Sequence, residues 1–487
     1  MNIRDFMTEY LRQRDMTLLD LTAKLGYRSK TSLVRIMNGE ISVRSLDAFA
    51  GRMRKLGALT EEESIRLDEA VEYMRWQDDY YPAREMLDFL QGNIREEGSI
   101  TLDFINPAQN DASAGQLPLT FDDVFKNGSE IEIQIVNSQY VPIYDKIYEL
   151  ITRMGAKVSH YLVADEDTSR TIHAMNAIFP IVFLPGYSGY LLRQSGAEGH
   201  NGIQASDFML ANWTNGSGVR CESLILFVNP NFGRVYRSVN PGTLARLVEI
   251  PKEGYRPIKK SFVDGFGGIN YVDFCIDCAD IERNRRMFGI KPDIAVEYIP
   301  VNILLNAARE GELGKSEGFE KMEDALVDIF ERRFRNTFQC RKAHHLIMKR
   351  SAVWKFVRTG RLSDHFWGMR PFTLRERAEI MRHLLEQAEN NPFFHLYFLK
   401  DNQFIRDIEV FCFDGKGLLI VNANTDYDLA QGHAEVMVDH PEFQRLYKDF
   451  YQKHLAREHA ISQADTLDFL RSLVEYCEDP NTTENEN

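Results

Sequence analysis

Between residues 17 and 39 lies a short run of polar and basic side chains that could contact a nucleic acid. Arg can donate two hydrogen bonds to a guanine edge, whereas Ser and Thr can reach a base or a thymine methyl group. Lys and backbone N–H groups at helix starts suit phosphate oxygens. We expect Arg35 to contact bases, and Lys30, Arg28 and Thr17 to contact phosphates. The full set of candidate contact residues is Thr17, Arg28, Ser29, Lys30, Thr31, Ser32 and Arg35.

Four short helices are expected to position these side chains. Apolar residues recur at helical spacing in four segments, namely 3–11, 18–25, 33–37 and 43–53. Thr17, Ser29 and Ser42 are suitable N-caps for the second, third and fourth helices. Gly26 should end the second helix, because a left-handed residue costs least without a Cβ.

This pattern resembles the Cro/lambda-repressor type of helix-turn-helix regulators over residues 3–57. The matching segments are Leu21-Thr22-Ala23-Lys24-Leu25-Gly26, Arg35-Ile36-Met37-Asn38-Gly39 and Ser42-Val43-Arg44-Ser45-Leu46. The turn after Gly26 is one residue longer than the commonest form. The resemblance implies that the third helix enters the major groove of a double-stranded DNA operator. It also implies a homodimer, because one such helix covers only a few base pairs.

The charge distribution favours the same interpretation. The chain of 487 residues has a net charge of −14. Residues 1–57 nevertheless hold 11 Lys and Arg against 6 Asp and Glu, whereas the remaining residues hold 47 against 66. A basic head on an acidic body is expected when one end of a chain meets phosphate.

Composition and length indicate a multidomain globular protein. A chain this long exceeds what one hydrophobic core usually organises. Six scattered cysteines fit a reducing compartment. The N-terminus lacks a signal-peptide layout, and no run of about 18 apolar residues occurs. We therefore expect a cytoplasmic protein that does not enter the membrane.

The predicted organisation has six parts. An all-α helix-turn-helix domain (1–57) and a helical connector with its linker (58–119) precede an α/β, or α+β, body. The body comprises an α/β unit (120–270), a mainly helical region (271–372) and a second α/β unit (373–478), followed by a disordered tail (479–487). The second unit partly repeats the first, which suggests two related units around a helical insert; independent use of hairpins is the alternative.

Other candidate sites do not form a complete motif. Cys275 and Cys278 have metal-ligand spacing, but Cys340 with His344 or His345 would have to complete the set from over sixty residues away. A phosphate-binding loop at 311–316 has Arg309 where its first glycine belongs. The glycine-rich segment 264–268 lacks the dinucleotide-binding fingerprint.

The histidines also form no catalytic motif in the sequence. Two-unit α/β proteins of the phospholipase D type would need His-x-Lys followed at fixed spacing by Asp. Tyr397 stands two residues after His395, where the lysine of this motif belongs. No metal, cofactor or catalytic residue is therefore predicted.

The sequence thus predicts a one-component transcriptional regulator that is not an enzyme. Its head would bind DNA, and its body would dimerise and sense a small-molecule or peptide effector. Two alternatives remain: an enzyme within residues 120–475 with a regulatory DNA-binding head, or a protein-interaction module without specific DNA binding.

Overall fold

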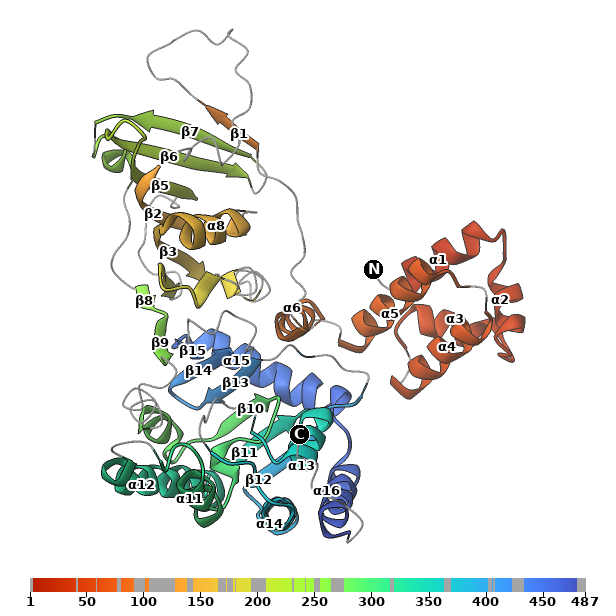
Figure 1. The fold of residues 1–487 in the computed structure, drawn as a ribbon. Coiled ribbons are helices and arrows are strands. Elements are labelled where there is room, and N and C mark those ends of the chain that lie inside the picture. The colour runs from red at the N-terminus through yellow and green to blue at the C-terminus, as the bar shows by residue number, and fades with distance from the viewer. Residues whose placement is uncertain are drawn as a thin grey trace. The chain divides into compact units, whose positions relative to one another are not determined.

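The computed structural model of the chain divides into two compact units, Met1–Leu87 and Asp88–Asn487 (Figure 1). A helical N-terminal region followed by a larger α+β body confirms the predicted multidomain fold class at this level. The structure describes residues 3–40, 43–57, 59–76, 80–91, 101–104, 128–137, 143–164, 172, 178–179, 181–193, 207–229, 232–240, 242–248, 255–263, 276–315, 319–362, 369–401, 405, 408–422 and 433–479. The predicted linker from 106, the glycine-rich segment 264–268, Ser42, Cys275 and the tail from 480 lie outside the described residues.

The first unit is helical. Its helices are α1 (Ile3–Gln13), α2 (Leu18–Lys24), α3 (Lys30–Met37), α4 (Val43–Lys55) and α5 (Glu61–Trp76), and α6 (Tyr80–Gln91) follows. The expected helix ends are present, because Thr17 caps α2 and Gly26 has a φ of 69°. Apolar side chains from all five of the first helices share one buried core, and the bidentate pair of Arg14 with Glu63, at 2.5 and 2.7 Å, joins α1 to α5.

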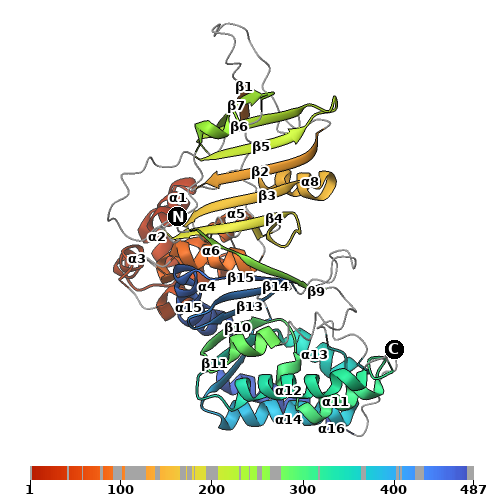
Figure 2. The same cartoon turned by 90° about the vertical axis from the view of Figure 1, so that its left-hand side faces the viewer.

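The second unit contains two mixed β-sheets in its described residues (Figure 2). The strand order is β1-β7-β6-β5-β2-β3-β4-β8 in the first sheet and β12-β11-β10-β13-β14-β15-β9 in the second. First-sheet strands are β1 (Thr101–Phe104), β2 (Ser129–Asn137), β3 (Lys157–Ala164), β4 (Tyr187–Arg193), β5 (Phe208–Thr214), β6 (Arg220–Asn229), β7 (Phe232–Ser238) and β8 (Tyr255–Pro257). Second-sheet strands are β9 (Lys259–Val263), β10 (Met287–Lys291), β11 (His344–Met348), β12 (Phe394–Phe398), β13 (Ile408–Phe413), β14 (Gly417–Asn422) and β15 (His433–Val438).

Helices connect and cover these strands. They are α8 (Tyr144–Met154), α11 (Val301–Glu310), α12 (Phe319–Phe338), α13 (Arg350–Thr359), α14 (Leu374–Asn390), α15 (Pro441–Phe450) and α16 (Gln463–Glu478). Short 3₁₀ segments, η2 (Ala245–Leu247) and η3 (Val296–Tyr298), and the π-helix η4 (Tyr451–His459) complete the set. Among the described residues, no helix is long and apolar enough to cross a bilayer.

The two sheets share one order over six of their strands. In the first sheet β2, β3 and β4 are parallel, and β5, β6 and β7 follow β2 in antiparallel pairs. In the second, β10, β11 and β12 are parallel and β13, β14 and β15 follow β10 in the same way. The region predicted as a helical insert, 271–372, therefore differs from expectation: it supplies β10 and β11, and α11 and α12 lie between them.

Each face of the second sheet packs against different helices. Met287, Leu346 and Phe394 point into a large core shared with α11, α12, α13, α14 and α16. The opposite face carries Phe288, whose ring meets that of Tyr451 in η4 at 5.4 Å. On this face Tyr447 of α15 also donates a hydrogen bond to the carbonyl of Val410 in β13. A thin layer of α15 and η4 thus covers the face that bears Phe288.

Two glycines that end helices give a matched stability prediction. Gly155 and Gly360 end α8 and α13 with φ of 64° and 66°. A Cβ at Gly155 would meet nothing within 4 Å, whereas one at Gly360 would lie 2.3 Å from the carbonyl oxygen of Phe372. We expect Gly155→Ala to cost about 1–2 kcal/mol of unfolding free energy. Gly360→Ala should cost about 1–3 kcal/mol more. Urea denaturation measures both, and equal losses would contradict the close packing at Gly360.

Candidate functional site

The predicted nucleic-acid contacts lie at the starts of α2 and α3 and, for Arg35, in the last turn of α3. Thr17 forms a capping box with Asp20, so its hydroxyl is engaged within the protein. Arg35 donates a 3.1 Å hydrogen bond to the carbonyl of Glu40 at the end of α3. Ser29 precedes α3 without a side-chain cap. The exposed members of the set are Thr17, Arg28, Ser29, Lys30, Thr31 and Arg35, and Ser32 is half-buried.

The rejected sequence motifs also have plain structural explanations. Within the described residues, no three His, Cys, Asp or Glu side chains could hold a metal ion together. Cys278 is buried, and Cys340 lies 3.9 Å from Asn284. The loop after Glu310 follows helix α11 rather than a strand, and Lys315 pairs there with Glu312 at 2.6 Å. The described part of the 311–316 loop therefore lacks the strand that precedes a phosphate-binding loop, and the Cys275–Cys278 pair is not tested because Cys275 lies outside the described residues.

Strand register brings together two histidines that the sequence leaves apart. Phe288, His345 and His395 lie opposite one another on β10, β11 and β12. The ring of His345 stacks on Phe288 at 4.9 Å and on His395 at 4.5 Å. Burial, the neighbouring His395 and the charge of Arg286 lower the pKa of His345 to about 4. Burial also lowers the pKa of His395. The imidazole of His345 is therefore uncharged at neutral pH, and an uncharged imidazole has one nitrogen lone pair.

The low pKa of His345 predicts a pH dependence. An unfolded chain should protonate this histidine near pH 6.5, whereas the folded protein does so near pH 4. Because the unfolded state binds the proton first, the free energy of unfolding should fall as the pH drops from about 6.5 to about 4. The imidazole Cε1–H signal, assigned by its loss in His345→Gln, should titrate with a midpoint of about 4. A midpoint near 6.5 would contradict the burial of this ring.

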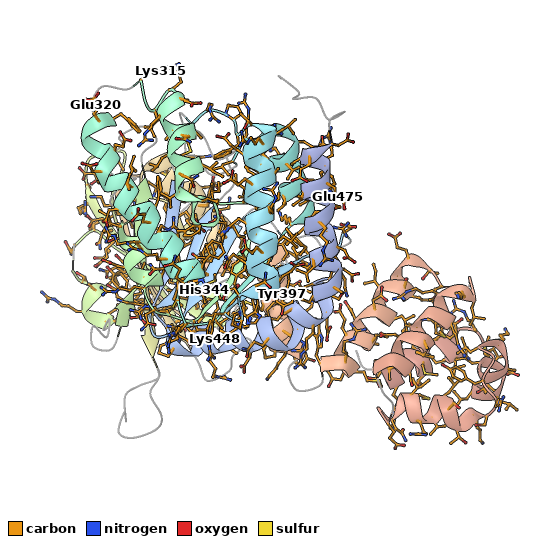
Figure 3. All side chains as sticks on the ribbon, turned by 90° about the horizontal axis from the view of Figure 1, so that it is seen from below. Lys315, Glu320, His344, Tyr397, Lys448 and Glu475 are labelled. Atoms are coloured by element: carbon orange, nitrogen blue, oxygen red, sulfur yellow. The ribbon has the colours of Figure 1, made fainter. Side chains whose placement is uncertain are left out.

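A pocket of about 440 Å³ opens beside this stack of rings. Three of its side chains are cationic, namely Arg286 just before β10 and Arg445 and Lys448 on α15; two are carboxylates, Asp414 and Asp449. Figure 3 labels Lys448. The complete lining is Arg286, Phe288, Asp414, Pro441, Gln444, Arg445, Lys448, Asp449 and Gln452. Phe288 lines the pocket and stacks on His345, so the pocket adjoins the His345–His395 stack through this ring, although neither histidine is among the lining residues.

The pocket charges pair with one another, one pair closely and two at longer distances. Lys448 forms an ion pair with Asp414, and Arg286 lies 3.9 Å from the same carboxylate. Arg445 lies 3.5 Å from Asp449. Side chains of these pairs are between about a quarter and a half exposed. Exposed ion pairs contribute little to stability, so an incoming anion can exchange with these carboxylates.

Local sequence explains how these side chains are held. His440 caps α15, where its Nδ1 accepts the N–H of Phe443 at 3.4 Å, and Pro441 suits the first turn of the helix. Arg445 and Lys448 are three residues apart and so share a helix face. Asp414 starts the β13–β14 turn, and its backbone N–H donates a 3.1 Å hydrogen bond to the carbonyl of Arg286. This bond holds the two oppositely charged residues side by side at the ends of the neighbouring strands β10 and β13.

A second charged cluster lies on the other face of the sheet and is buried. Lys291 Nζ lies 2.5 Å from Glu409 Oε1, and both side chains are less than 10% exposed. Arg333 donates to Glu282 at 2.7 Å and lies 3.3 Å from Glu297. Burial raises the pKa of Glu282, which Arg333 partly opposes. Each of these charges faces an opposite charge and is closed off from solvent. We therefore infer that this cluster stabilises the fold and does not bind a ligand.

The sequence contained only weak signals for the pocket. Asp414 lies in a hairpin turn and Pro441 begins a helix, and the charged side chains of these two segments are typical of solvated surfaces. Arg286 precedes a strand that sequence periodicity missed. The histidine pair depends on the register of three strands, which no spacing along the chain reveals.

Comparison with known proteins returns solved structures only. No family model and no curated protein matches the chain. Two of the solved structures are polyphosphate kinase from Porphyromonas gingivalis (12% identity, TM-score 0.20) and phosphatidylserine synthase from Haemophilus influenzae (10% identity, TM-score 0.25). Each match covers 72% of this chain, with 52% of the kinase and 89% of the synthase. The chain thus spans about half the length of the kinase.

These comparisons correct the predicted function. Both solved structures are enzymes, and neither is a DNA-binding regulator. These findings contradict the predictions of DNA binding, of transcription regulation and of a protein without enzymatic activity. Their alternative, an enzyme within residues 120–475, is better supported. At TM-scores of 0.20 and 0.25, the likenesses support nothing further about the substrate or the catalytic residues.

Proposed function

We propose that residues 280–460 form the site of an enzyme that acts on a small phosphate ester. The observation that supports this proposal is the meeting of three cationic side chains in a pocket that adjoins two stacked imidazoles. Arg286, Arg445 and Lys448 bind the phosphate, and His345 supplies the base or nucleophile.

The lining of the pocket favours an anionic ligand. Three cations face two carboxylates, which leaves an excess of one positive charge. Guanidinium groups suit the oxygens of a phosphate because they can donate two parallel hydrogen bonds, and an ammonium adds a point charge. A volume of about 440 Å³ falls within the range of small-molecule sites. The pocket therefore has room for a phosphate and a compact organic group.

His345 is better suited than His395 to the reactive role. Its ring is in the middle of the stack and contacts Phe288, which lines the pocket. The low pKa keeps its nitrogen unprotonated at neutral pH but also makes it a weaker base than an ordinary imidazole. An uncharged imidazole can remove a proton from an attacking hydroxyl or attack the phosphorus itself, and both roles occur in group transfer.

Removing the pocket cations tests the binding of phosphate. We expect Arg286→Gln combined with Lys448→Gln to weaken the binding of inorganic phosphate at least tenfold, measured by calorimetry at low ionic strength. Lys315→Gln is the matched control, since it removes a cation of an exposed ion pair outside the pocket. Phosphate binding that is unchanged in the double variant would contradict the proposal.

Three expectations from the sequence remain proposals: the helix-turn-helix resemblance, the homodimer and the cytoplasmic location. The resemblance of residues 3–57 to Cro/lambda-repressor-type proteins concerns the arrangement of α1 to α4 alone. Self-association of the chain can be measured by sedimentation. A cytoplasmic location rests on the cysteine content.

A further inference from the structure

Asp414 presents a carboxylate to the cations of the pocket. Its carboxylate pairs with Lys448 and lies 3.9 Å from Arg286, so two of the three pocket cations face one carboxylate of the protein. The third cation, Arg445, lies against Asp449, which also faces Lys453 at 3.6 Å. The ligand of this pocket must therefore compete with a carboxylate that is already in place.

This competition discriminates between ligand anions by their charge. A carboxylate or a phosphodiester has one negative charge, so it would replace Asp414 without adding to the attraction. Asp414 also has the advantage of being held beside the cations by the chain, through its backbone hydrogen bond to Arg286. A phosphomonoester has close to two negative charges above about pH 6 and three oxygens, and so it can exceed the attraction of Asp414.

We propose that Asp414 makes the pocket selective for phosphomonoesters over phosphodiesters and carboxylates. This inference rests on the proposed function, because it assumes that Arg286 and Lys448 bind the phosphate. The substrate class is accordingly a compact molecule with a terminal phosphate dianion.

The test compares methyl phosphate, a dianion at pH 8, with dimethyl phosphate, a monoanion, in calorimetric titrations of the full chain. The wild type should bind methyl phosphate at least tenfold more tightly than dimethyl phosphate. Asp414→Asn should bind dimethyl phosphate at least tenfold more tightly than the wild type does. The ratio of its affinities for methyl phosphate and dimethyl phosphate should therefore be smaller than in the wild type. Glu312→Gln removes a carboxylate of an exposed ion pair outside the pocket and should preserve the wild-type preference.

The outcomes separate this inference from the proposed function. An unchanged preference in Asp414→Asn would overturn the role of Asp414, while the effect of the cation variants on phosphate binding would still stand. Failure of the wild type to bind either ester would overturn both. The side chain of Asp414 is 40% exposed, and an unchanged thermal midpoint for the Asn variant excludes misfolding as the cause of altered binding.

Discussion

Lys291→Met is expected to lower the free energy of unfolding by about 3–5 kcal/mol. Lys291 and Glu409 join β10 to β13 at 2.5 Å, with side chains only 3% and 8% exposed. Loss of the ammonium would leave the buried Glu409 carboxylate without the charge of Lys291. A buried charge without its partner is costly, because neither water nor a counter-ion compensates it.

Urea denaturation of three variants checks this expectation. Lys291→Met combined with Glu409→Met should recover much of the loss, since replacing both members of a buried pair by apolar residues is often close to neutral. Lys315→Met breaks an exposed pair and should change stability little. If Lys291→Met were as stable as Lys315→Met, the pair would not be buried as described.

His345→Ala is expected to reduce turnover of p-nitrophenyl phosphate by about 10²–10⁴-fold, the usual contribution of a positioned acid or base. Binding of inorganic phosphate should remain, because the cations of the pocket are untouched. Added imidazole should restore part of the activity by entering the space left by the ring. This rescue would not follow from a purely structural role.

His395→Phe is the matched control for this variant. It keeps an aromatic ring beside His345, whose stacking distance to His395 is 4.5 Å, while it removes the second imidazole. Turnover within about tenfold of the wild type is expected, because a single proton acceptor suffices. Equal and severe losses in both variants would instead assign the chemistry to the pair.

Helix caps and hairpin turns made much of the fold predictable. Thr17 and Gly26 mark helix ends correctly, and in the structure Pro441 begins a helix and the turn at Asp414 joins two antiparallel strands. Strands β10 and β11 escaped notice because they are short and largely buried on both faces. Such strands lose the alternation of polar and apolar residues that identifies a half-exposed strand.

The candidate site was not predictable because it depends on register and on distant segments. Phe288, His345 and His395 become neighbours only when three parallel strands align. Along the chain, most strands of the second sheet lie between Arg286 and Lys448. The motif and charge of the first unit, by contrast, are local signals, and they led to a functional prediction for the whole chain that the comparisons contradict.

The location of a bound phosphate mimic tests the central claim most directly. Crystals of the full chain soaked in tungstate can be examined by anomalous scattering, which locates the heavy anion without prior assumptions. The proposal predicts a peak within hydrogen-bond distance of Arg286, Arg445 and Lys448, and the loss of this peak in Arg286→Gln combined with Lys448→Gln. Peaks found only elsewhere on the protein would contradict a phosphate site in this pocket.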